Sequence, residues 1–202
     1  MVKKNDQLSR REAIRQRQRN QQARSRLLFT GIAVVLVVFV GLFIWNIVKP
    51  PVGDAIEIME NGTDHVEEGV KVDYSTNPPT SGPHYAQTLY AGFFDETSQE
   101  AAIPNAESHI VHNLEHGYVV FWYNCSDLDA AACTALKDEI RAVIADVGAD
   151  KVIAFPWTSI SEVVVLTSWG QELRMDEFDA DAAASFVEAN RSHPRAPEPF
   201  AQ

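Results

Sequence analysis

The longest hydrophobic run of the chain extends from Leu27 to Val48, 22 residues without a charged side chain. As an α-helix this run would be about 33 Å long, close to the ~30 Å thickness of bilayer hydrocarbon. Residues 1–26 are rich in Lys and Arg, which favours a cytoplasmic location for them. We therefore expect a cytoplasmic arm (1–26), a single transmembrane helix (27–48) in the plasma membrane, and an extracytoplasmic C-terminal part. A cleaved signal peptide is the alternative, although its apolar core would be only about 7–15 residues long.

The rest of the chain mixes one long amphipathic pattern with several short apolar runs. Apolar residues every three or four positions predict a helix over 127–147, and Asp179 can cap a second helix that ends at Asn190. This order of elements favours the α+β class, with one antiparallel sheet and two helices. A linker (49–54) would precede this domain (55–192), and an irregular tail (193–202) would follow it. Strands are expected at 55–59, 118–123, 151–155, 162–169 and 172–175, the last two joined by a turn at Gly170-Gln171.

The charge of the chain is divided unevenly. Residues 1–26 carry nine basic and two acidic residues, a net charge of +7, so the rest of a chain of net charge −11 carries −18. An acidic surface repels phosphate backbones, which argues against nucleic acid as a partner. The expected partners are the lipid bilayer and, as a further possibility, another protein of the cell envelope.

Cys125 and Cys133 are the only two cysteines, and both follow the predicted membrane span. Outside the cytoplasm a disulfide is expected, and here it would join the end of a strand to the first turn of the next helix. The seven intervening residues differ from the two-residue spacing of a redox pair. A metal or redox role of the two thiols is the alternative.

Three of the six histidines lie in the segment HIVHNLEH, residues 109–116. On a helix the three rings would share one face, whereas on a strand His112 and His116 would be about 13 Å apart. Because one metal ion cannot bridge that distance, metal binding by this pair requires a helical turn before Gly117. The alternative is that these histidines only satisfy backbone groups.

The same segment matches the H-x-x-E-H pattern of inverted zinc proteases, with Glu115 as the base. Such an enzyme needs a well-packed helix, a third ligand and an open coordination position. Pro104 and Gly117 limit this helix to about three turns. The pattern is therefore weak support for a zinc hydrolase, and we favour a non-enzymatic protein.

The segments PPTSGPH (78–84) and VHNLEHG (111–117), followed by an aromatic strand, resemble the bacterial and archaeal domain of unknown function 3105. The resemblance covers most of residues 60–198 and includes Tyr74, the segment LTSWG and a closing Pro197-Glu198 pair. It implies an extracytoplasmic domain, commonly behind one membrane helix, and implies no activity. His109 is not part of the motif. The histidines that belong to the pattern are His65, His84, His112 and His116.

Together these observations predict that the four motif histidines converge on one metal ion. An all-imidazole set suits copper or zinc, whereas calcium and magnesium prefer oxygen ligands. Glu115 would orient a ligand ring, and Met59 or Met175 could add a thioether to a copper ion. The main hypothesis is a membrane-anchored metal-binding domain. A non-catalytic envelope interaction module with structural histidines is the alternative.

Overall fold

The computed structural model describes residues 31–41 and 52–201. Residues 31–41 are helical and exposed, and the chain divides into two compact units, Met1–Lys49 and Pro50–Gln202. None of the described helices combines the length and apolarity needed to cross a bilayer. The predicted arm (1–26), both ends of the predicted span (27–30 and 42–48) and residues 49–51 of the linker lie outside the described residues. Membrane attachment therefore stays a prediction.

A six-stranded mixed sheet forms the centre of the second unit. The inner strands β5 (Val119–Tyr123) and β6 (Val152–Pro156) are parallel, and β4 (Gly92–Phe93) is parallel to β6 at one edge. On the other side of β5, the strands β7 (Val164–Ser168), β8 (Gln171–Met175) and β1 (Asp54–Ala55) follow in antiparallel pairs. The predicted α+β class is confirmed.

The prediction of an antiparallel sheet is wrong for β4, β5 and β6, which pair in parallel. The hairpin β7–β8 is antiparallel as its two-residue turn requires, with Ser168 opposite Gln171. Between β5 and β6, however, the chain passes through the long helix α3 (Ala130–Val147). A helix of this length returns the chain to the end at which the first strand began, so the two strands run in the same direction.

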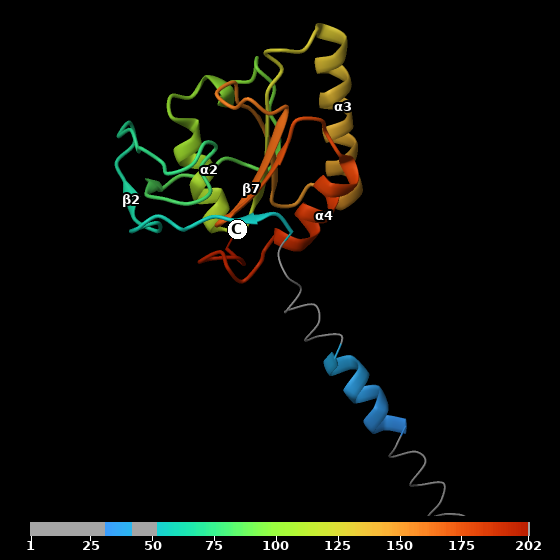
Figure 1. Cartoon of the computed structure of the whole chain (residues 1–202). Helices are drawn as coiled ribbons and strands as arrows, with labels where there is room; N and C mark the ends of the chain where they lie inside the picture. The colour runs from blue at the N-terminus through green and yellow to red at the C-terminus, as the bar shows by residue number, and fades with distance from the viewer. Residues whose placement is uncertain (1–30, 42–51, 202) are drawn as a thin grey trace, which may run out of the picture. The chain divides into compact units, whose positions relative to one another are not determined.

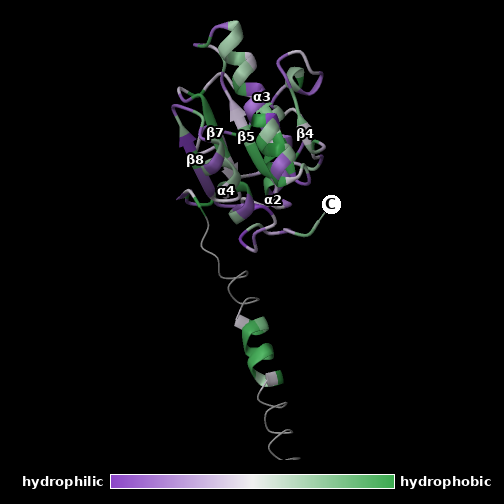
Figure 2. Cartoon of the chain, turned by 90° about the vertical axis from the view of Figure 1, so that its right-hand side faces the viewer, coloured by the Kyte–Doolittle hydropathy of each residue, from purple (hydrophilic) through white to green (hydrophobic). Residues whose placement is uncertain are grey.

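Helices cover both faces of the sheet (Figure 1). Val119, Phe121 and Tyr123 of β5 pack with residues of α3 and α4 (Ala180–Asn190), while Val120 and Trp122 pack on the opposite face with residues of α2 (Ala106–Glu115). Both faces of β5 are thus buried, which explains its continuous apolar sequence. The hydropathy colouring shows these central strands as the apolar interior (Figure 2).

The prediction of two helices is also wrong, because α2 and the short 3-10 helix η1 (Glu100–Ala102) are present in addition to α3 and α4. The other predicted elements are close to those observed. Asp129 and Asp179 each accept a hydrogen bond from a backbone amide in the first turn of α3 and α4, and so cap the two helices. The segment 55–59 contributes only its first residue to a strand.

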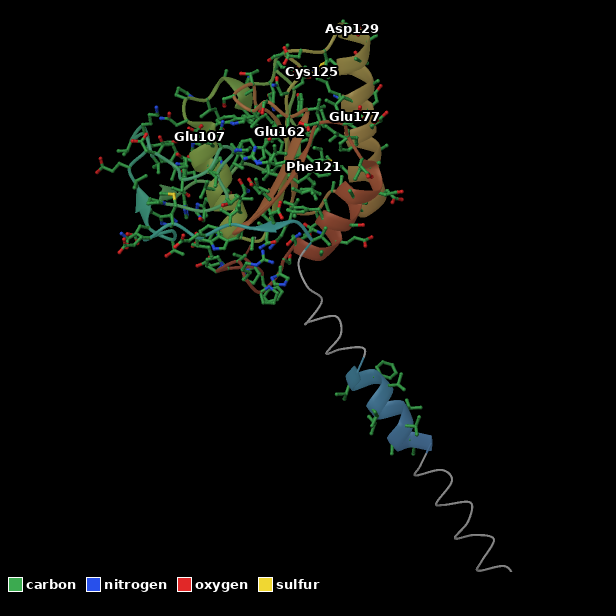
Figure 3. All side chains as sticks on the ribbon, in the orientation of Figure 1. Glu107, Phe121, Cys125, Asp129, Glu162 and Glu177 are labelled. Atoms are coloured by element: carbon green, nitrogen blue, oxygen red, sulfur yellow. A yellow bond between two sulfur atoms is a disulfide. The ribbon has the colours of Figure 1, made fainter. Side chains whose placement is uncertain are left out.

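A disulfide joins Cys125 and Cys133, as predicted. Figure 3 shows Cys125 and the capping residue Asp129 at the start of α3, on the face of the sheet away from α2. Cys125 packs against the core that α3 and α4 form with the sheet. The bridge therefore ties β5 to α3 and takes no part in the arrangement of the histidines.

Candidate metal centre

Helix α2 is buried on its polar side as well as on its apolar side. Ile110, Val111 and Leu114 pack against the sheet, while the polar side faces the segment 85–89. The ring of His112 donates from Nδ1 to the Tyr85 carbonyl (2.9 Å), and the Asn113 side chain bonds both the amide and the carbonyl of Leu89 (3.0 and 2.7 Å). These bonds satisfy buried backbone groups of the segment and remove the cost of burying a polar helix face.

His109 belongs to the same row of bonds between α2 and the segment 85–89. Its Nδ1 lies 2.8 Å from the Gln87 carbonyl, its Nε2 lies 3.5 Å from the Glu68 carboxylate, and its ring packs on Tyr85. These contacts account for both ring nitrogens. His109 therefore has a structural role, in agreement with its absence from the family motif.

The proline-rich segment 73–83 brings a second histidine to α2. It leads into β3 (His84–Tyr85), which pairs in parallel with β2 (His65–Val66), so that His65 lies opposite His84. The Tyr74 hydroxyl lies 3.0 Å from both the Pro83 carbonyl and the Ser108 hydroxyl of α2. Burial raises the pKa of Tyr74, so the hydroxyl keeps its proton and holds the segment on the helix.

Three imidazoles and one carboxylate meet at this point. One ligand atom from each of His65, His84, His112 and Glu115 lies within 4.8 Å of all the others. The centroids of the three imidazole rings are 4.8, 4.9 and 5.1 Å apart. Ligands of a tetrahedral zinc ion are about 3.4 Å from one another, so a contraction of at most about 1.4 Å would complete the site. His65 is exposed and the other three residues are buried, which leaves the cluster open on one side.

The hydrogen bonds fix which nitrogen of each buried ring is free. His84 donates from Nδ1 to the Gly82 carbonyl (2.8 Å) and His112 from Nδ1 to the Tyr85 carbonyl (2.9 Å). In their neutral forms both rings therefore present an unprotonated Nε2, the ligating nitrogen. Such a bond from the second nitrogen to a carbonyl is typical of metal-binding histidines.

The free nitrogens point at the Glu115 carboxylate. Its Oε2 lies 3.0 Å from His84 Nε2 and 3.9 Å from His112 Nε2. Two acceptors cannot bond directly, so a proton or a cation has to lie between Glu115 and His84. Burial, reinforced by the nearby His84 ring, lowers the pKa of His112 to about 4, so this ring is neutral near pH 7 and its Nε2 carries a lone pair.

His116 lies beside this cluster and is not one of the four residues that form it. Its Nε2 is 3.1 Å from His112 Nε2 and 3.4 Å from the Glu198 carboxylate. Burial lowers the pKa of His116, with the two nearby glutamates acting in the opposite direction. Because neutral His112 carries its proton on Nδ1, its Nε2 accepts, and His116 donates to it from Nε2.

The structure thus brings together three of the four predicted ligands, His65, His84 and His112. Glu115, which we expected to orient a ring, contributes an oxygen to the cluster itself. Met175 lies in the core against α3 and α4, on the other face of the sheet, and the Met59 sulfur accepts a bond from the Ser75 amide. Neither methionine is part of the histidine cluster as described.

Two residues near the cluster were not predicted. Lys151 is 8 % exposed and donates from Nζ to the carbonyls of His116, Pro199 and Ala201. Glu198 lies in the tail and contacts His116. The only sequence signal for either residue is the closing Pro-Glu pair of the family pattern, which marked Glu198 without giving it a role.

The fold and the cluster define a mixed α+β domain with a histidine–carboxylate group that could hold a metal ion. The chain belongs to the family described as "protein of unknown function (DUF3105)", which matches residues 65–202. This match confirms the resemblance found in the sequence. No curated protein and no solved structure matches the chain.

Proposed function

We propose that this protein is a single-pass membrane protein whose extracytoplasmic domain binds zinc or copper through His65, His84, His112 and Glu115. The observation that carries the proposal is the orientation of two buried rings. Both bond a backbone carbonyl through Nδ1, and both direct Nε2 toward the same carboxylate. A bond from Nδ1 to a carbonyl that directs Nε2 at a shared point is the usual arrangement of metal-binding histidines.

The donor set supports a choice among metals. Three imidazoles and one carboxylate suit Zn²⁺ or Cu²⁺, whereas Cu⁺ prefers thiolate or thioether ligands. Cys125 and Cys133 are joined in a disulfide and lie away from the cluster, so they offer no thiolate. The rings of His84 and His112 are held in place by backbone carbonyls. His65 is exposed and leaves the ligand atoms accessible to an ion.

A hydrolase with Glu115 as its base has less support. In the H-x-x-E-H scheme the glutamate activates water beside the metal and is not itself a ligand. Here its Oε2 lies 3.0 Å from His84 Nε2 and belongs to the ligand group. We therefore propose a metal-binding role, in metal handling or in stabilising the fold, without catalysis.

The test is a metal titration of the full chain in detergent with Zn²⁺ and Cu²⁺, followed by metal analysis after gel filtration. We expect one ion per chain and a large loss of affinity in His84→Gln/His112→Gln. His193→Gln is the matched control, because His193 lies in the tail, outside the cluster, and its ring accepts from the Arg195 amide. A wild-type chain that stays free of both metals at micromolar concentrations would refute the proposal.

The topology is tested separately by protease protection in intact cells. We expect an epitope at the C-terminus to be digested from outside, and an epitope at the N-terminus to be protected until the membrane is opened. Protection of the C-terminal epitope would refute the extracytoplasmic location and leave metal binding unaffected.

A further inference from the structure

The ring of His116 is held differently from the rings of the cluster. Its Nδ1 is buried and has no hydrogen-bond partner in the described part of the chain, whereas Nδ1 of His84 and of His112 is bonded to a carbonyl. Ligation through Nε2 would move the His116 proton to Nδ1, where it would stay unsatisfied. His116 is therefore suited to bind a metal ion weakly and to release it easily.

The tail places a carboxylate next to this weak ligand. The Glu198 amide donates to the Glu115 carbonyl (3.0 Å), and Lys151 bonds the carbonyls of Pro199 and Ala201 (2.8 and 2.7 Å) together with that of His116. Glu198 is thus fixed at its own backbone and at the residue that follows it. Its side chain is 60 % exposed, and its Oε2 lies 3.4 Å from His116 Nε2.

His116 and Glu198 form a second set of ligand atoms that overlaps the first. Both sets include Nε2 of His112, which is 3.1 Å from His116 Nε2 and 3.9 Å from Glu115 Oε2. One imidazole nitrogen has one lone pair and binds one ion at a time. The two sets therefore cannot both be filled, and they mark two alternative positions for the same ion.

We propose that His116 and Glu198 form an outer position for the metal ion, from which it passes to the inner cluster. The proposal rests on the proposed function. Glu198 captures the ion at the acidic surface, and His116 and His112 bind it next. The bonds to Glu198 and His116 then break as bonds to His84, His65 and Glu115 form, while the bond to His112 is kept.

This arrangement makes a kinetic prediction. An intermediate position lowers the barrier in both directions, so its loss slows binding and release equally and leaves the dissociation constant nearly unchanged. A permanent ligand behaves differently, because its loss accelerates release and weakens affinity. Sites lined by charges opposite in sign to the ligand raise association rates by about 10–1,000-fold, and we expect the loss of one capturing carboxylate to fall at the low end of this range.

The test uses Co²⁺ as the probe, mixed with the full chain by stopped flow and displaced by excess Zn²⁺. We expect Glu198→Gln and His116→Gln to slow association and dissociation about tenfold, with the dissociation constant changed less than about threefold. Glu188→Gln is the matched control, since Glu188 is an exposed residue of α4 outside both ligand sets. In His84→Gln we expect faster release and weaker binding.

Two results would overturn the outer position. One is a Glu198→Gln protein with wild-type rates, and the other is a Glu198→Gln protein that loses affinity through faster release alone. Either result leaves the inner cluster and the proposed function intact. A wild-type chain that binds none of Co²⁺, Zn²⁺ and Cu²⁺ would refute both proposals.

Discussion

Adding a single methyl group at Gly82 should perturb the metal site through the backbone carbonyl that holds the His84 ring. Its carbonyl accepts the Nδ1–H of His84, and its φ of +139° is one that side-chain-bearing residues rarely adopt. A Cβ atom at this position would lie 2.9 Å from the Met59 sulfur and 2.9 Å from two ring atoms of Tyr74. The Met59 side chain can move aside, but the Tyr74 ring is held by its bonds to Pro83 and Ser108.

The structure gives a magnitude for Gly82→Ala. The strained backbone costs about 1–3 kcal/mol, and the contact with a fixed ring adds about 1 kcal/mol or more. We expect a loss of ~3 kcal/mol in the free energy of unfolding, which lowers the melting temperature by about 8 °C for a domain of this size. A shift of the Gly82 carbonyl also frees the His84 ring, and loss of such a bond weakens metal affinity about 10–100-fold.

Gly69→Ala is the matched control for this substitution. Gly69 also has a positive φ (+92°), but a Cβ there would meet no atom within 4 Å. The control therefore carries the backbone strain without the crowding and without a bond to a ligand ring. Urea unfolding and Zn²⁺ titration of both variants in the full chain are the assays. If Gly82→Ala binds Zn²⁺ as tightly as Gly69→Ala does, the carbonyl bond does not control the His84 ring and the reasoning is wrong.

Three further predictions concern parts of the domain around the site. Lys151→Met leaves three carbonyls without their donor and should lower the free energy of unfolding by about 2–4 kcal/mol, measured in urea. Without metal, the chain should lose stability as the pH falls below about 6.5, because a buried histidine with a lowered pKa binds fewer protons in the folded state than in the unfolded state. The free energy of unfolding is measured in urea titrations at several pH values. His193→Asn should make its dependence on pH less steep. The residues concerned are His112, His116 and His193. Cys125→Ser/Cys133→Ser opens a short loop and should cost ~2.5 kcal/mol in thermal or urea unfolding, while Zn²⁺ affinity stays unchanged because the bridge lies on the other face of the sheet.

The secondary structure around the central sheet could be predicted because its signals are local. The three- and four-residue spacing of apolar positions indicated α3, the capping residue Asp179 indicated α4, and the two-residue turn at Gly170-Gln171 indicated β7 and β8. The direction of β6 relative to β5 is not a local property, since it depends on where α3 returns the chain. The expectation of an antiparallel sheet extended the geometry of one hairpin to strands that no hairpin connects.

The two-residue strands β2 and β3 carry no periodicity at all. Their pairing places His65 opposite His84, and it depends on contacts between segments that are distant in the sequence. The family motif marked both histidines without saying that they are neighbours in a sheet. Their convergence on His112 was a hypothesis from residue type, and only the arrangement of the backbone could show it.

The role of Glu115 illustrates why ligand sets are hard to derive from residue types alone. Two rings can present Nε2 to one point only if their Nδ1 atoms are occupied elsewhere, and here the partners are the carbonyls of Gly82 and Tyr85. Every residue, proline included, offers a backbone carbonyl, so no side-chain pattern encodes this choice. Once both rings are fixed in this way, the neighbouring carboxylate faces two lone pairs, and a cation between them removes the repulsion. The cluster is thus a consequence of how the segment 82–89 lies along α2, which makes the bonds of that segment as important for metal affinity as the ligands themselves.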